Sequence, residues 1–329
     1  MKTIAADIKS RTFKRVYLLY GKEDFLRNSY KRQLTTAISG SDTMNKLVLE
    51  GKGIDLSQVK DFLDTMPFFA DYRLVVLSDT GLFSSSQDGW DKMLADIPET
   101  SALVFCEREV DKRNKLFKAV GKYGYAASFE TPSENELIYW IAQNFKRDGK
   151  VADRYVCENL LERCGSDMEN LKNQIEKLIS YTGERAKITT EDLDAVCTEQ
   201  VTNQVFAMID AATEGKLKKA FDLYQDMLVL NEKPLRIMYL IGRQCNILLV
   251  VRQMNAAGAD VNTIGAEIGM RYPSLVRKSI NQSKAFTEKN LKELVEMSVE
   301  LEELVKTGRM DENIAVETAL IQISRIHPV

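Results

Sequence analysis

Residues 16–32 read VYLLYGKEDFLRNSYKR, and this stretch decides the fold. Val16–Tyr20 is a short apolar run typical of a buried strand, Gly21 follows it, and a helix is predicted next. A strand, a glycine turn and a helix near the start of an α/β domain form the phosphate site of P-loop proteins. That site needs the pattern G-x-x-x-x-G-K-[ST], but Gly21 is followed by Lys-Glu-Asp (residues 22–24), with no second glycine and two carboxylates where phosphate would lie. The sequence therefore predicts a nucleotide-binding fold that lacks the nucleotide-binding residues.

Composition and charge restrict the classes of protein to consider. A length of 329 residues predicts two to three domains, and a net charge of −3 means that any nucleic-acid contact must come from a local basic face. The five cysteines form no C-x-x-C pair, which argues against a disulfide scaffold and a zinc site and fits a reducing cytoplasm. The single histidine, His327, is near the C-terminus, so His-based metal or triad chemistry is not expected. We see no signal peptide and no long apolar run, and expect a cytoplasmic chain that does not span a membrane.

The first third of the chain alternates between strand and helix patterns. Leu74–Leu77 and Leu103–Cys106 are short and fully apolar, as expected when helices cover both faces of a parallel sheet. Other strands are predicted at 46–50 and 126–129, with helices from about 56, around 90–94 and at 111–121. These patterns predict an α/β domain with a parallel sheet over residues 1–132.

The remainder of the chain is predicted to be helical. Pro132 breaks the chain, and Ser133 and Glu136 have the spacing of a capping box that begins a helix. A small helical domain is predicted over residues 133–204 and a third, all-α domain over residues 205–329. The third domain includes a helix from Pro234 and two shorter segments, 264–269 and 273–283, with helix-turn-helix proportions.

Six segments, in order and with matching spacing over essentially the full length, resemble the delta-subunit family of bacterial DNA polymerase III. They are YGKEDFL (20–26), MPFFADYRLVVL (66–77), DKRNKLFKAV (111–120), PSENELIYWI (132–141), GSDMENLKNQIEKL (165–178) and KTGRMDENIAVE (306–317). The resemblance implies an AAA+-like α/β domain, a helical lid and an all-α collar that joins the other clamp-loader subunits. It also implies a clamp-loader subunit of the DNA polymerase III holoenzyme, a nucleotidyltransferase complex, with no ATP hydrolysis, cofactor or metal of its own. The implied partners are the beta sliding clamp, the gamma/tau-type ATPase and delta-prime-type subunits, and primer–template DNA.

Other positions agree with the loss of ATP chemistry. The strand 74–77 leads to one acid, Asp79, where an ATPase needs a pair of carboxylates. By resemblance, Met168 stands where active AAA+ lids carry an arginine, and Arg108 is a poor arginine-finger candidate. No catalytic, nucleotide-binding or metal-binding residue is therefore expected. The competing hypothesis is a divergent P-loop ATPase or kinase at Gly21, which only Lys22 favours.

The resemblance assigns clamp binding to Phe68 and Phe69. In the family, two adjacent apolar residues before the RLVVL-type strand form a wedge that enters a hydrophobic pocket on the clamp. Consecutive apolar residues beside buried strands usually pack inward, so the residues alone favour a core position; the resemblance reverses this for at least one ring. Residues that flank the contact would be Met66, Pro67, Ala70, Asp71, Tyr72 and Arg73.

Two basic clusters are candidates for contact with DNA phosphates. Lys112 and Arg113, with Lys115 and Lys118, belong to the predicted helix 111–121. Arg271, Arg277 and Lys278 belong to the segment of helix-turn-helix proportions. The residues alone favour a solvated helix face for each cluster over DNA contact. A DNA-binding regulator that uses Arg271–Lys278 is the third hypothesis.

Overall fold

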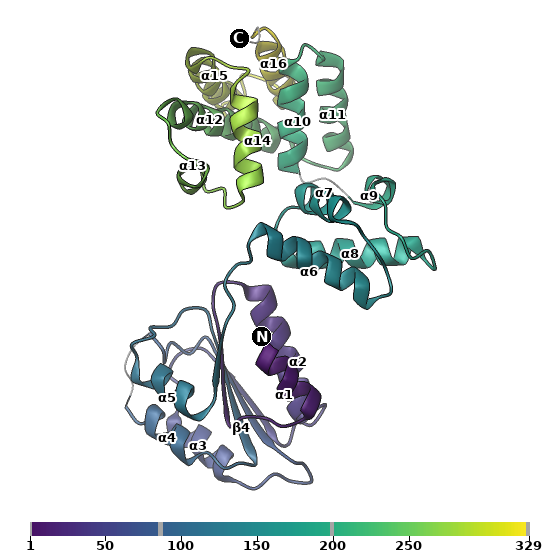
Figure 1. Cartoon of the computed structure of the whole chain (residues 1–329). Coiled ribbons are helices and arrows are strands. Elements are labelled where there is room, and N and C mark those ends of the chain that lie inside the picture. The colour runs from purple at the N-terminus through teal and green to yellow at the C-terminus, as the bar shows by residue number, and fades with distance from the viewer. Residues whose placement is uncertain (1, 85–87, 198–200, 327–329) are drawn as a thin grey trace. The chain divides into compact units, whose positions relative to one another are not determined.

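The computed structural model describes residues 2–84, 88–197 and 201–326, so His327 lies outside the described residues (Figure 1). Its contacts divide the chain into two compact units, residues 1–132 and residues 133–329. The division of the second unit into a lid and a collar at residues 204 and 205 stays a prediction.

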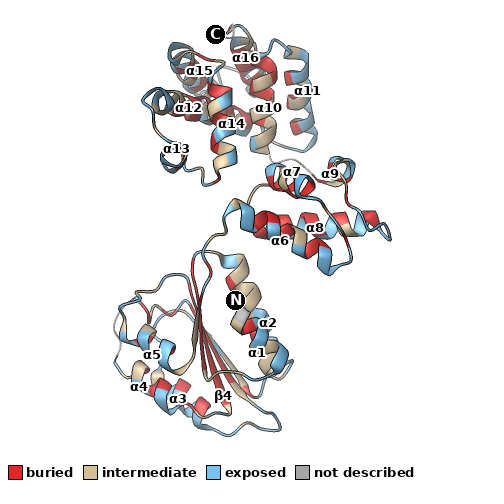
Figure 2. Ribbon diagram, in the orientation of Figure 1, coloured by how far each residue is buried: buried red, intermediate tan, exposed pale blue. Residues whose placement is uncertain are grey.

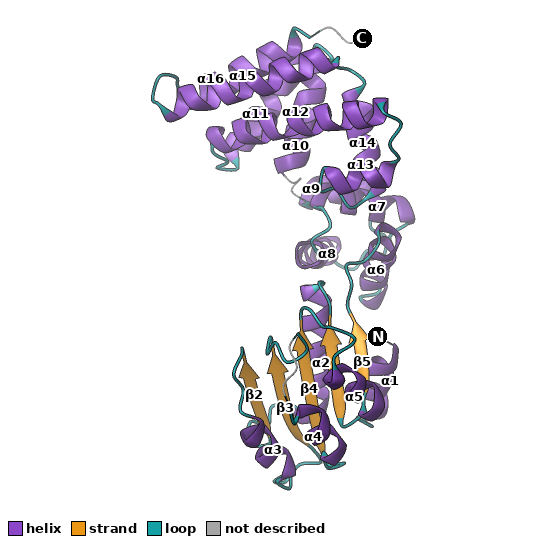
Figure 3. Ribbon diagram, turned by 90° about the vertical axis from the view of Figure 1, so that its left-hand side faces the viewer, coloured by secondary structure: helices purple, strands orange, loops and turns teal. Residues whose placement is uncertain are grey.

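The first unit contains a parallel five-stranded sheet with the order β2-β3-β4-β1-β5 (Figure 3). The strands are β1 (Val16–Tyr20), β2 (Lys46–Glu50), β3 (Arg73–Ser78), β4 (Ser101–Glu107) and β5 (Tyr125–Ser128). The helices are α1 (Lys2–Ser10), α2 (Asp24–Ser39), α3 (Leu56–Asp64), α4 (Trp90–Asp96) and α5 (Lys115–Tyr123). The predicted parallel sheet is confirmed, whereas α1 was not predicted.

Both faces of the sheet are covered, and successive strand residues alternate between two cores. On one face, strand side chains such as Leu18, Val75 and Phe105 pack with α3, α4 and α5. On the other face, side chains such as Leu19 and Val104 pack with α1 and α2. Figure 2 shows the strands as the buried centre of this unit. The apolar strand runs in the sequence therefore come from burial on two sides.

Helix α5 begins later than predicted. The segment 111–114 precedes the helix, and Asn114 caps it by accepting a hydrogen bond from the Leu116 N–H. Asparagine at this position satisfies one of the free N–H groups of the first turn. The prediction that Lys112 and Arg113 lie on a helix is therefore wrong, because both come before its cap.

The described residues of the second unit form helices joined by loops, with one isolated bridge between Val151 and Lys187. Its helices are α6 (Glu134–Arg147), α7 (Arg154–Cys164), α8 (Met168–Thr182), α9 (Thr190–Val196), α10 (Val201–Thr213), α11 (Leu217–Val229), α12 (Pro234–Ala256), α13 (Val261–Glu267), α14 (Pro273–Ser283), α15 (Glu288–Lys306) and α16 (Glu312–Ser324). The capping box of Ser133 and Glu136 is confirmed, and Pro234 lies in the first turn of α12 as predicted.

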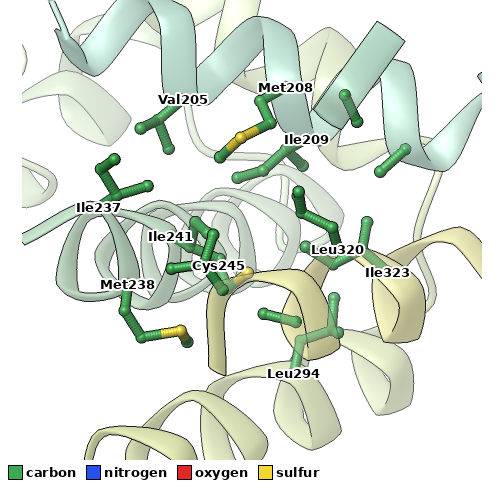
Figure 4. Packing of buried hydrophobic residues seen from close by; sticks show 14 of the residues in the cluster. Val205, Met208, Ile209, Ile237, Met238, Ile241, Cys245, Leu294, Leu320 and Ile323 are labelled. Atoms are coloured by element: carbon green, nitrogen blue, oxygen red, sulfur yellow. The ribbon is translucent and has the colours of Figure 1, made fainter. Parts of the chain in front are cut away.

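Helix α12 packs against α10, α11, α15 and α16 in one hydrophobic core. Figure 4 shows Ile237, Ile241 and Cys245 of α12 facing residues such as Ile209 and Leu320. Among the described residues, α12 alone has the length and apolar composition to cross a membrane, and 44% of its most apolar window is buried in the structure. Its composition is accounted for by this position in the core.

Candidate functional site

The loop after β1 uses its backbone donors within the fold. The Gly21 N–H donates to the Glu107 carbonyl (3.2 Å) and the Glu23 N–H donates to the Phe129 carbonyl (2.9 Å). Only three residues separate β1 from α2, and the Gly21 φ is +130°. A side chain at Gly21 would approach the Phe129 carbonyl oxygen to 2.3 Å, so this glycine permits the close approach of the two segments. A phosphate cradle needs free N–H groups, and these two are engaged.

The positively charged side chain of Arg27 contacts the same loop. Arg27, on the first turn of α2, is buried; its guanidinium donates to the Gly21 carbonyl and pairs with Asp24 (2.6 Å). Sequence reasoning missed Arg27, because an arginine within an amphipathic helix gives no signal of burial. The other ATP-related positions also serve the fold: Met168 is buried in the core of the helices, and Asp79 is exposed at the end of β3.

Phe68 and Phe69 lie in the connection between α3 and β3, and both are exposed. The exposed fractions are 55% for Phe68 and 95% for Phe69, and the two rings pack edge to face with centroids 4.5 Å apart. The alternative that these rings belong to the core is therefore wrong for both. Exposed adjacent aromatic rings on a folded domain are the usual mark of a protein-binding surface.

The flanking residues divide into exposed and supporting ones. Met66 is 75% exposed and Ala70 is exposed, so both extend the apolar surface, whereas Pro67 is half-buried. Tyr72 is half-buried and packs edge to face on Phe13, with ring centroids 5.5 Å apart. We define the exposed set of Met66, Phe68, Phe69 and Ala70 as the wedge surface.

The connection that carries the wedge surface is anchored on both sides. Arg73 donates from Nε to the Met66 carbonyl (3.2 Å) and its guanidinium lies 4.5 Å from the centre of the Phe62 ring. Asn45, just before β2, exchanges two hydrogen bonds with the backbone of Phe68. Sequence reasoning missed Asn45, since a single polar residue before a strand carries no pattern.

The wedge surface and the Gly21 loop lie at opposite ends of the parallel strands. The wedge surface precedes β3, at the amino ends of the strands, whereas Gly21 follows β1, at the carboxyl ends. Because all the paired strands are parallel, these ends are on opposite edges (Figure 3). A protein bound at the wedge surface would leave the Gly21 loop uncovered.

Several of the basic candidates contact other side chains of their own unit. Arg113 pairs with Asp111 (3.0 Å), and the Lys112 ammonium lies 5.8 Å from the centre of the Tyr20 ring. In the second unit, Lys278 pairs with Glu162 (2.7 Å).

Arg271 precedes α14 rather than lying on it, so it does not share a helix with Arg277 and Lys278. Arg277 and Lys278 border a cavity of about 960 Å³ that Glu158, Asp210 and Glu214 also line. This mixed charge is a poor match for phosphate.

The buried carboxylate of Glu107 has a structural role. It accepts hydrogen bonds from the Thr80 N–H (3.0 Å) and hydroxyl (2.6 Å), and burial raises the pKa of its carboxyl. Among the described residues, no group of three or more His, Cys, Asp or Glu side chains is placed to hold a metal ion.

Comparison with known proteins now gives the family. The model of the DNA polymerase III delta subunit matches residues 17–128, and the model of its C-terminal domain matches residues 202–323. This chain belongs to the DNA polymerase III delta-subunit family. The DNA polymerase III subunit delta of Bacillus subtilis (strain 168) is 23% identical over 322 residues, which cover 94% of this chain and 92% of that protein. A probable DNA polymerase III subunit delta of Aquifex aeolicus (strain VF5) is 22% identical over 85% of this chain and 83% of that protein.

A solved structure supports the same fold for this delta-family chain. The Bacillus subtilis DNA clamp loader delta protein superposes with a TM-score of 0.76 at 21% identity, covering 98% of this chain and 99% of that one. The predicted fold class, an AAA+-like α/β domain with a parallel sheet followed by an all-helical part, is confirmed.

Proposed function

We propose that this chain is a non-catalytic clamp-loader subunit of DNA polymerase III that grips the sliding clamp with Phe68 and Phe69. It would hold one clamp interface open while other subunits bind and hydrolyse ATP. The observation that carries the proposal is the exposure of both rings, at the position where the family pattern has its clamp-binding residues. ATP-driven rearrangement of the assembly would expose or cover the wedge surface, as a shift between populations of states.

The energetics of the wedge surface favour this role. Burying one large apolar side chain contributes roughly 1.5–3 kcal/mol, so two adjacent rings can anchor an interface of modest size. Because their connection is already fixed to the fold by Asn45 and Arg73, little conformational freedom is lost on binding.

The Gly21 loop supports a subunit without ATPase activity. Its N–H groups at Gly21 and Glu23 are engaged, and the guanidinium of Arg27 donates to the Gly21 carbonyl. The hypothesis of a divergent P-loop ATPase then rests on Lys22 alone. Tight Mg-ATP binding by the isolated chain, measured by calorimetry, would overturn this part of the proposal.

The proposed partners follow from the family. The C-terminal helices carry exposed apolar residues, including Val229, Val299 and Ile314, that suit contacts with the gamma/tau-type and delta-prime-type subunits. Primer–template DNA would be met only in the assembled loader, with exposed Arg271 as the remaining candidate for phosphate contact. We place the chain in the cytoplasm, with the rest of the replication machinery.

The proposal is tested by binding of the cognate clamp to the wild type and to the double variant Phe68→Ala/Phe69→Ala. We expect the variant to lose at least a hundredfold in affinity with an unchanged melting temperature, since both rings are exposed. Clamp binding at wild-type strength by the folded double variant would contradict the assignment.

A further inference from the structure

Asn45 is a buried polar residue outside the exposed wedge surface. Its side chain is 1% exposed and sits between β2 and the connection that carries Phe68. The Phe68 N–H donates to Asn45 Oδ1 (2.7 Å), and Asn45 Nδ2 donates back to the Phe68 carbonyl (2.8 Å). A side-chain amide thus pairs with the backbone of one residue through both of its polar groups, as a neighbouring strand would.

Two further contacts fix the position of Asn45 itself. Its Nδ2 also donates to Asp42 Oδ2 (2.6 Å), which sets which end of the amide is the donor. Its backbone carbonyl accepts from the Leu74 N–H (2.8 Å), the second residue of β3. Asn45 therefore holds the connection at Phe68 and at Leu74, and Phe69, Ala70 and Asp71 between them are exposed. We call residues 68–74 the bend.

The bend includes an uncommon backbone conformation at its tip. Phe69 has a φ of +50°, a left-handed conformation that non-glycine residues rarely adopt. Such a conformation persists only where the surroundings impose it. Phe69 has no burial to impose it, because its side chain is 95% exposed. The backbone restraint at the preceding residue, which Asn45 supplies, is the contact that can do so.

We propose that Asn45 is the positioning residue of the wedge surface: it fixes the Phe68 backbone so that both rings are presented to the clamp before contact. This inference rests on the proposed function. A connection freed from Asn45 would have to be ordered during binding, and that ordering lowers affinity without the loss of any contact with the clamp.

The test compares Asn45→Ala with a matched control, Thr80→Val. Thr80 is also buried and also makes side-chain hydrogen bonds, to Glu107 and from the Leu82 N–H, but it follows the carboxyl end of β3. Both variants should melt at a lower temperature. We expect only Asn45→Ala to weaken clamp binding, by about tenfold or more, and to speed hydrogen exchange of the Phe68 N–H in the free chain. A general structural loss would move the melting temperature alone.

Two more variants keep the result decisive. Asn45→Asp keeps an acceptor for the Phe68 N–H but places a carboxylate oxygen against Asp42 and the Phe68 carbonyl, so both its affinity and its melting temperature should fall at neutral pH and partly recover at acidic pH, where a protonated carboxyl can donate. In the Phe69→Ala background, Asn45→Ala should cost less affinity than in the wild type, because part of what it positions is gone. Full additivity, unchanged exchange of the Phe68 N–H, or an affinity loss no larger than that of Thr80→Val would overturn the inference.

The same measurements separate the inference from the function on which it rests. If Phe68→Ala/Phe69→Ala loses the clamp and Asn45→Ala does not, the inference alone is wrong. If the double variant keeps the clamp, the proposed function fails and the inference falls with it.

Discussion

Glu107 illustrates, at the scale of one residue, how buried polar contacts hold the carboxyl ends of β3 and β4 together. Its carboxylate is 3% exposed and binds Thr80 and Gly81 in the loop after β3. Burial, and secondarily the charge of Asp79, raises the pKa of this carboxyl above its ordinary value of 4.5. A raised folded-state pKa means that the contribution of Glu107 to stability is full below about pH 4.5 and is lost as the pH rises through the folded-state pKa.

We therefore expect Glu107→Gln to stabilise the protein at neutral pH. The amide keeps an oxygen for the Thr80 donors and has no charge to desolvate. The gain in free energy of unfolding should be near zero at pH 4 and grow to about 1 kcal/mol or more at pH 7, in urea titrations at a series of pH values. Exposed Glu109→Gln is the control and should show no such trend. A gain that is the same at all pH values would show that ionisation of Glu107 is not its cause.

At the same scale, Phe68 and Phe69 could be found only through the resemblance to the family, in which two adjacent apolar residues precede the RLVVL-type strand. Asn45 and Arg27 could not, since their roles depend on backbone atoms that only the fold brings close. The residues alone favoured a core position for the two rings, whereas both are exposed in the structure.

At the scale of elements, the sequence predicted helices and strands correctly where their buried residues recur at regular spacing or form a continuous apolar run. The strands β1, β3 and β4 were predicted because each packs on two faces and contains an apolar run of at least four residues. Helix α1 was missed: it is short, and Ile4 and Ile8 are the side chains that it contributes to the core. The N-terminal cap of α6 was predicted correctly. The start of α5 was predicted at Asp111, but Asn114 caps this helix.

The capping box of α6 gives a prediction at this scale. Ser133 accepts from the Glu136 N–H, and the Glu136 carboxylate accepts from the Ser133 N–H (2.8 Å). Replacement of Ser133 by Ala should lower the free energy of unfolding of the second unit by about 1 kcal/mol, measured by urea denaturation followed by circular dichroism. Ser180→Ala, at an exposed position within α8, should be neutral or slightly stabilising. Equal effects of the two variants would mean that the cap does not stabilise α6.

At the scale of the whole molecule, each compact unit has its own proposed function: the first unit binds the clamp, and the second contacts the other loader subunits. The first unit has cores on both faces of its sheet and carries the wedge surface, and its boundary falls at Pro132. The second unit has the large helical core around α12 and the exposed apolar residues assigned to subunit contacts. Independent cores are what allow a piece of a chain to fold alone.

We accordingly expect a fragment of residues 1–132 to fold and to bind the clamp as tightly as the full chain, because Asn45, Phe68 and Phe69 are all within it. The same fragment should fail to co-purify with the other loader subunits. Calorimetry with the clamp and size-exclusion chromatography with the loader subunits measure the two properties, and fragment 133–329 should give the reverse result. A folded fragment 1–132 with much weaker clamp binding would mean that the second unit contributes to the clamp interface directly, and the separation of tasks would then be wrong.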